Sequence, residues 1–220
     1  MAHRFYLKSD KDQVKTQLHI AFLALFFNAV AFFIAIITGL YFLFFIFLVI
    51  SLTLIAPFID VPQLKKSGKF IYYSNLFLAE KEKDGIIKVH GGTLFDYVFT
   101  LEKSWSPQKR KSYILQQYLE GLLTLIETFE NQDKIKIKGT TYFVNAKTLK
   151  RFGFKKVSTD NIQKFILFYN YFNLLVSNSF VHQKLSFPSM RNLATFEGEI
   201  SEIGKQKELI ETLNQKLKKQ

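Results

Sequence analysis

The sequence predicts an α+β protein in which an N-terminal two-helix transmembrane hairpin precedes an antiparallel-sheet domain covered by helices, with a C-terminal helix. Three observations lead to this fold class. Residues 20–58 contain no charged side chain and no histidine, residues 70–101 alternate strand-like runs with turn signals, and residues 107–131 and 159–181 are helical in pattern. The expected parts are a cytoplasmic amphipathic lead-in (1–19), the hairpin (20–58), a cytoplasmic α+β domain (61–192) and a charged C-terminal helix (193–220).

The charge-free run is 39 residues long, from Ile20 to Phe58. One span of a hydrocarbon core about 30 Å thick needs about 20 apolar residues, whereas 39 residues in one helix would reach about 58 Å. We therefore predict two spans. Thr38-Gly39 lies at the middle and predicts the turn between them.

Basic residues lie on both flanks of the run, and the turn carries no charge. The positive-inside rule then places both termini in the cytoplasm and the turn on the far side of an inner (plasma) membrane. The run is also much longer than the apolar region of a signal peptide. The flanking cations are Arg4, Lys8, Lys11, Lys15, Lys65, Lys66 and Lys69.

Within the spans, Asn28, Ser51 and Thr53 are polar, but no side chain is ionisable. This absence argues against a transporter or pump that acts alone. A membrane asparagine forms hydrogen bonds with neighbouring helices. Asn28 therefore predicts either packing within the hairpin or association with another molecule.

The first part of the domain predicts a three-stranded antiparallel meander. Apolar runs at 70–79 precede the turn signal Asp84-Gly85 and a strand at 86–90. Gly91-Gly92 predicts a second turn, which leads into a third strand at 93–101. Alternation places Thr93, Phe95, Tyr97, Phe99 and Leu101 on one face, which we expect to meet the core.

Ser106-Pro107 predicts the start of a helix, with serine as N-cap and proline in the first turn. Its apolar stripe runs to about residue 131 and should pack on the meander. Short strands are expected at 134–138 and 141–144, separated by a turn at Gly139 and followed by a short helix.

The stretch 159–181 has two interpretations, a buried central helix or a helix lying flat on the membrane, because Phe and Tyr suit the lipid interface. The tail from 193 onward has apolar residues seven apart, so it predicts either a coiled coil with a partner or packing against its own domain.

The net charge of +12 lies outside the hairpin and favours contact with anionic lipid headgroups. Nucleic acid is not the expected partner, because no nucleic-acid recognition motif accompanies the charge. The densest basic segment has no acidic residue within it, and its eight cations are the expected lipid- or anion-contacting residues. They are Lys134, Lys136, Lys138, Lys147, Lys150, Arg151, Lys155 and Lys156.

His90 and Asp96 are the weak catalytic candidates. His90-Gly91-Gly92 resembles the HGG segment in the oxyanion loop of some esterases, but the chain has no G-x-S-x-G pentapeptide. If Gly91-Gly92 forms a two-residue turn, Asp96 lies on the opposite sheet face from His90, and the two side chains should not meet.

Metal and cofactor sites are not expected. The four histidines share no zinc-binding spacing, there is no cysteine, and both common phosphate-binding loop motifs are absent. Without cysteine, disulfide scaffolds are excluded.

Residues 140–157, TTYFVNAKTLKRFGFKKV, resemble the closing strand, helix and Gly-Phe segment of acyl-CoA N-acetyltransferases. That family's pyrophosphate loop, Q/R-x-x-G-x-G/A, is absent from the chain, so the activity is not inferred from the resemblance.

These features favour a non-enzymatic, membrane-anchored scaffold or assembly subunit, with a homo-oligomer or a larger membrane complex as its expected assembly. The alternative is an enzyme that acts at the bilayer surface on a lipid or acylated substrate. His90, Asp96 and the basic segment would then be its parts.

Overall fold

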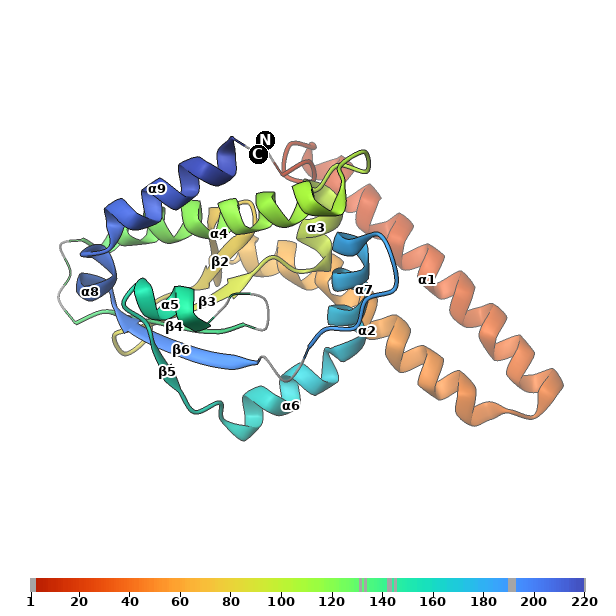
Figure 1. Cartoon of the computed structure of the whole chain (residues 1–220). Helices are drawn as coiled ribbons and strands as arrows, with labels where there is room; N and C mark the ends of the chain where they lie inside the picture. The colour runs from red at the N-terminus through yellow and green to blue at the C-terminus, as the bar shows by residue number, and fades with distance from the viewer. Residues whose placement is uncertain are drawn as a thin grey trace.

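The computed structural model describes residues 3–130, 132, 134–141, 144, 146–189 and 193–219. It is a mixed α+β structure that begins with two long antiparallel helices, α1 (Asp10–Thr38) and α2 (Tyr41–Lys66), projecting from the rest of the molecule (Figure 1). Gly39 joins them with a φ of 72°, a backbone conformation that glycine adopts without strain. The predicted turn at Thr38-Gly39 is confirmed.

Both helices are long and apolar enough to cross a membrane, and they are the two such helices in the described part of the chain. Their apolar side chains are mostly exposed rather than packed in a core. Between them, Asn28 Nδ2 donates to Ser51 Oγ at 2.7 Å. Asn28 therefore stabilises packing within the hairpin, one of its two predicted roles.

Six strands form one sheet in the order β1-β2-β3-β4-β6-β5. β3 and β4 are parallel, and all other neighbours are antiparallel. The prediction of a purely antiparallel sheet is wrong at this pair, because the long connection between β3 and β4 forms a helical crossover. The strands are β1 (Phe70–Ser74), β2 (Phe77–Glu80), β3 (Ile86–Gly91), β4 (Lys136–Thr141), β5 (Lys155–Val157) and β6 (Ala194–Glu199).

The predicted strand at 93–101 is wrong, because this segment forms helix α3 (Leu94–Thr100). The meander consists of β1, β2 and β3 instead. A capping box decides the helix, since the Asp96 carboxylate accepts a hydrogen bond from the Thr93 backbone N–H at 2.7 Å. The Thr-x-x-Asp pattern that favours a helix start is present in the sequence. Here it prevails over the apolar alternation that favours a strand.

Helix α4 (Pro107–Phe129) covers one face of the sheet, α8 (Ile200–Gly204) packs on α4 and β6, and α9 (Lys207–Lys218) packs on α4 (Figure 1). The predicted N-cap is confirmed, because Ser106 Oγ accepts from the Lys109 backbone N–H. Ile203 and Ile210 of the C-terminal segment are fully buried in the main core. This segment therefore packs on its own domain. The helix expected from 193 onward is wrong for 194–199, which forms β6 and pairs with β4 and β5.

The stretch 159–181 forms two helices, α6 (Asn161–Tyr169) and α7 (Tyr171–His182), rather than the single helix expected. α7 packs against α2, α3 and α4. No residue of α6 is buried.

Between β4 and β5 lies α5 (Ala146–Arg151), followed by Gly153 in a left-handed conformation. The strand, helix and Gly-Phe order of the resemblance is therefore present. Gly139 lies inside β4 and makes no turn, because Val89 and Phe196 flank it on the neighbouring strands. Two residues of the expected 141–144 strand, 142 and 143, lie outside the described residues.

Candidate functional site

The two weak catalytic candidates have different partners. His90 Nε2 lies 3.0 Å from Glu80 Oε1 on β2, whereas Asp96 Oδ1 lies 3.2 Å from His3 Nε2. The sequence predicted that His90 and Asp96 would not meet because they would lie on opposite faces of a sheet. That reason was wrong, since Asp96 lies on helix α3 and not on a facing strand. The glycines of the HGG segment serve packing, because a Cβ at Gly91 would collide with the Tyr118 hydroxyl.

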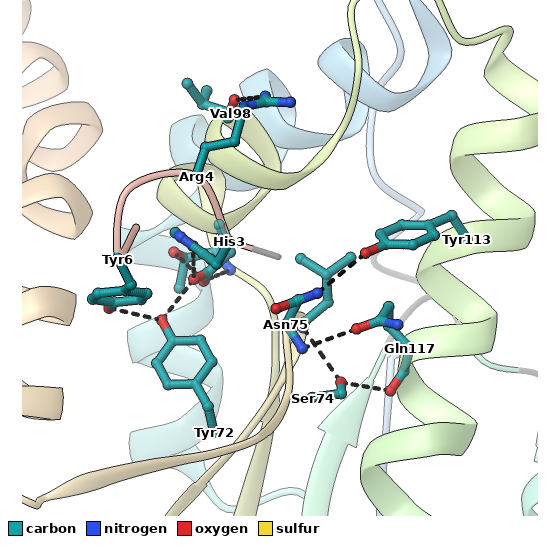
Figure 2. Close-up of polar contacts among 12 residues, drawn as sticks. His3, Arg4, Tyr6, Tyr72, Ser74, Asn75, Val98, Tyr113 and Gln117 are labelled. Carbon is teal, nitrogen blue, oxygen red and sulfur yellow. Dashed lines mark hydrogen bonds and ion pairs between the residues drawn. The ribbon is translucent and has the colours of Figure 1, made fainter. Parts of the chain in front are cut away.

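Asp96 is the centre of a buried polar cluster. Its side chain is fully buried, and Tyr72 OH donates to Oδ1 at 2.6 Å. Thr93 supplies a backbone N–H at 2.7 Å and a hydroxyl at 2.8 Å to Oδ2. Tyr6 OH in turn donates to Tyr72 OH at 3.4 Å. The cluster joins the N-terminal segment, β1 and α3, as Figure 2 shows.

Burial raises the pKa of Tyr72 far above the usual value for tyrosine, and the nearby Asp96 carboxylate raises it further. Burial is also the main cause of the raised pKa of Tyr6. Both phenols therefore keep their protons as hydrogen-bond donors at neutral pH.

The cluster borders a crevice of about 790 Å³ between the N-terminal segment, β1, α4 and the end of α9. On its other wall, Asn75 N donates to Gln117 Oε1 at 2.9 Å, and Asn75 Nδ2 donates to Tyr113 OH at 3.3 Å (Figure 2). Ser74 Oγ donates to the Gln117 backbone oxygen at 2.7 Å. β1 and α4 are thus held together along this wall.

Cations and aromatic rings face each other around the crevice. Lys65 Nζ lies 3.3 Å from the centroid of the Tyr6 ring, and Lys109 Nζ lies 5.5 Å from that of Trp105. The lining residues are His3, Tyr6, Leu7, Lys65, Tyr72, Tyr73, Ser74, Asn75, Trp105, Lys109, Ser112, Tyr113, Gln116, Gln117, Glu120, Thr124, Leu217 and Lys218.

His3 at the edge of the crevice is packed among aromatic rings. The ring of His3 is enclosed by Tyr6 and Phe95 at centroid distances of 4.6 and 5.1 Å. Its Nδ1 is buried and has no hydrogen-bond partner among the described residues. The buried imidazole orients the N-terminal segment through its contact with Asp96.

Sequence reasoning missed His3 and Tyr72, although it named Asp96. His3 lies 93 positions from Asp96, and no local pattern connects them. The Thr-x-x-Asp capping motif could have placed Asp96 at a helix start, but its buried partners depend on the tertiary fold.

The basic segment, 134–156, contains no acidic residue, but the fold brings acidic side chains next to it. Its cations are spread over β4, α5, β5 and the turn that precedes β4. Lys136 Nζ lies 3.3 Å from Glu197 Oε1, and Glu197 pairs in register with both Lys138 and Lys155. Part of the positive charge is therefore neutralised by β6, whose Glu197 lies 61 positions after Lys136.

No group of three His, Cys, Asp or Glu side chains within the described ranges is arranged to hold a metal ion. The expectation that the chain needs no cofactor stays a prediction.

No protein-family model matches the sequence, and no curated protein or solved structure is significantly similar to it. Function must therefore be argued from the hairpin, the crevice and the surfaces of the chain.

Proposed function

We propose that this chain is a membrane-anchored scaffold or assembly subunit that presents its crevice to a partner protein at a fixed position on the bilayer. In this proposal the hairpin is the anchor, and the domain and both termini lie on the cytoplasmic side of an inner (plasma) membrane. The observation that supports it best is the buried contact between hairpin and domain.

The anchor is supported by the exposed surfaces of α1 and α2. Apolar side chains such as Phe22, Leu25 and Phe45 are 68%, 68% and 63% exposed. Large continuous apolar surfaces are unfavourable in water and mark membrane or protein contacts. The basic flanks favour the orientation with both helix ends toward the cytoplasm.

The contact between hairpin and domain is a hydrophobic cluster. Phe5, before α1, and Val61, near the end of α2, are 1% and 4% exposed and pack with Leu78 and Phe95 of the domain. Arg4 adds a hydrogen bond from its backbone N–H to Phe99 O at 3.1 Å. Both ends of the hairpin are therefore fixed to the domain, unlike a flexible tether.

The crevice lies beside the ends of α1 and α2 that are away from the hairpin turn, because Leu7 and Lys65 line it. In Figure 1 the N-terminal segment and the end of α9 lie together at the top, opposite that turn. A partner that enters the crevice would then come from the aqueous phase. Tyr and Trp are enriched at binding hot spots, and the lysines around the crevice suit a polar or acidic segment of a partner protein.

Photo-cross-linking in native membranes tests this proposal. A photoreactive amino acid at Lys109, which lines the crevice, should give a discrete adduct with one partner, identified by mass spectrometry. The matched control is Gln108, its exposed neighbour on α4, which does not line the crevice. Trp105→Ala should weaken the adduct at Lys109. The same diffuse pattern at both positions, or no adduct at either, would contradict a partner in the crevice.

A further inference from the structure

Helix α6 is an apolar helix that the fold leaves uncovered. Its side chains Ile162, Phe165 and Phe168 are 74%, 68% and 77% exposed, and α7 is its main packing neighbour. The apolar surface continues past α7, where Leu185 and Phe187 are 71% and 66% exposed. A surface of this kind requires a partner.

The first two turns of helix α7, 171–178, have the reverse polarity of a helix in water. Asn173, Ser177 and Asn178 are buried, whereas the apolar side chains Phe172 and Val176 are 41% and 37% exposed. Asn173 Nδ2 donates to the backbone oxygen of Thr53 in α2 at 3.3 Å. Polar groups that turn inward and apolar groups that turn outward are the arrangement expected next to lipid.

The same hydrogen bond gives the position of Asn173 in α7 along the hairpin. Thr53 lies five positions inside the charge-free run, which ends at Phe58. At 1.5 Å per residue, this is about 8 Å along α2, within the 5–10 Å to which interfacial helices bury their apolar face. Figure 1 shows α6 running across the direction of α1 and α2, as a helix in the membrane plane would.

Charge around α6 fits the headgroup region. Lys155 and Lys156 precede the helix, Lys164 lies within it and Lys184 follows α7, whereas Asp160 is the single acidic residue from 155 to 184. Each cation near an anionic surface contributes about 1 kcal/mol.

We propose that α6 and the outer face of α7 lie in the cytoplasmic lipid interface, with Phe165 and Phe168 among the acyl chains and Lys164 at anionic headgroups. This inference rests on the proposed membrane hairpin. It gives the domain a third membrane contact, separate from both spans, so that the domain lies on the bilayer and does not tilt away from it.

Depth-dependent fluorescence quenching tests this inference on the full chain in liposomes that contain anionic phospholipid. The chain has no cysteine, so an environment-sensitive dye can be attached to one introduced cysteine at a time. The positions are Phe165→Cys on α6, Leu25→Cys on α1 as the hairpin reference, and Lys216→Cys on α9 as the aqueous control.

We expect emission at shorter wavelength and loss of intensity with acyl-chain quenchers for the labels at Leu25 and Phe165, and neither change at Lys216. If Leu25 is quenched but Phe165 is not, α6 is not interfacial although the hairpin stands. If Phe165 emission shifts without lipid quenching, a protein surface such as a second copy covers α6, and the inference is wrong. If Leu25 is not quenched, both the hairpin and the inference fail.

Discussion

Asp96 connects three parts of the chain that are far apart in sequence. Its carboxylate accepts hydrogen bonds from Tyr72 and Thr93 and lies against His3, so one side chain orients the N-terminal segment, β1 and α3. Buried polar groups of this kind are costly when a partner is missing. The stability of the crevice wall therefore depends strongly on this residue.

Asp96→Ala should lower the free energy of unfolding by about 3–5 kcal/mol, because it leaves several buried donors without an acceptor. Glu80→Ala is the matched control. The Glu80 side chain is 40% exposed beside His90 and Lys88, and such surface pairs are worth about 0–1 kcal/mol. Denaturant titration in detergent micelles measures the free energy of unfolding of both variants. Equal losses of stability in Asp96→Ala and Glu80→Ala would contradict the central role of Asp96.

The buried tyrosines predict a loss of stability at alkaline pH. The pKa of Tyr72 is raised in the folded state above the model-compound value of 10.0. The unfolded chain therefore releases this proton first, so the stabilisation is complete below about pH 10 and decreases as pH rises above it. Tyr6 and Tyr113 have pKa values raised in the same direction.

Phenolate absorbance and circular dichroism, followed together during alkaline titration, test this prediction. The buried phenols should ionise only in a late step, as the fold is lost. Tyr72→Phe should remove part of the late step. If all the phenols ionise while the fold is intact, the buried cluster does not exist as described.

Helix starts and turns could be predicted from local sequence, whereas strand pairing depends on contacts between distant residues. The turn at Gly39 and the start of α4 at Ser106 were predictable, because backbone freedom and capping act over a few residues. The helix at 94–100 was missed because aromatic alternation was given more weight than the capping motif. The parallel pairing of β3 with β4 joins residues about 50 positions apart, which no local pattern specifies.

The contact between α4 and β2 depends on Gly121. A Cβ at this position would lie 2.7 Å from the Phe77 ring, so Gly121→Ala should destabilise the domain by about 1–3 kcal/mol through overpacking. This cost exceeds the gain of up to about 1 kcal/mol in helix propensity.

Gly204→Ala in α8 is the control, because its Cβ would meet Ile126 at an ordinary 3.7 Å. This variant should be neutral or slightly stabilising in the same thermal unfolding measurement. If Gly121→Ala raises the melting temperature, the close contact of α4 with β2 is wrong.

The two helices of the hairpin are coupled by the hydrogen bond between Asn28 and Ser51. A double-mutant cycle with Asn28→Ala and Ser51→Ala should give a coupling energy of about 0.6–2 kcal/mol. Asn28→Ala combined with Thr38→Ala should give none, because Thr38 Oγ1 bonds to its own helix at Ile34. Equal coupling in both cycles would contradict the hairpin register.

For the whole molecule, only part of the candidate site could be predicted from the sequence. Asp96 was named, but its partner His3 and the crevice beside it arise from segments that only folding brings together. The basic segment was recognised, but its partial neutralisation by Glu197 of β6 was not. The apolar run and its flanking charges, in contrast, need no tertiary information to predict a membrane hairpin.

That hairpin is the central claim, and cysteine accessibility in cells that express the full chain tests it most directly. Leu40→Cys lies beside the turn and Lys150→Cys lies on α5 of the domain. A membrane-impermeant maleimide should label Leu40→Cys in intact spheroplasts and Lys150→Cys only after permeabilisation. Labelling of Lys150→Cys from outside, or protection of Leu40→Cys until permeabilisation, would contradict the anchor and its orientation.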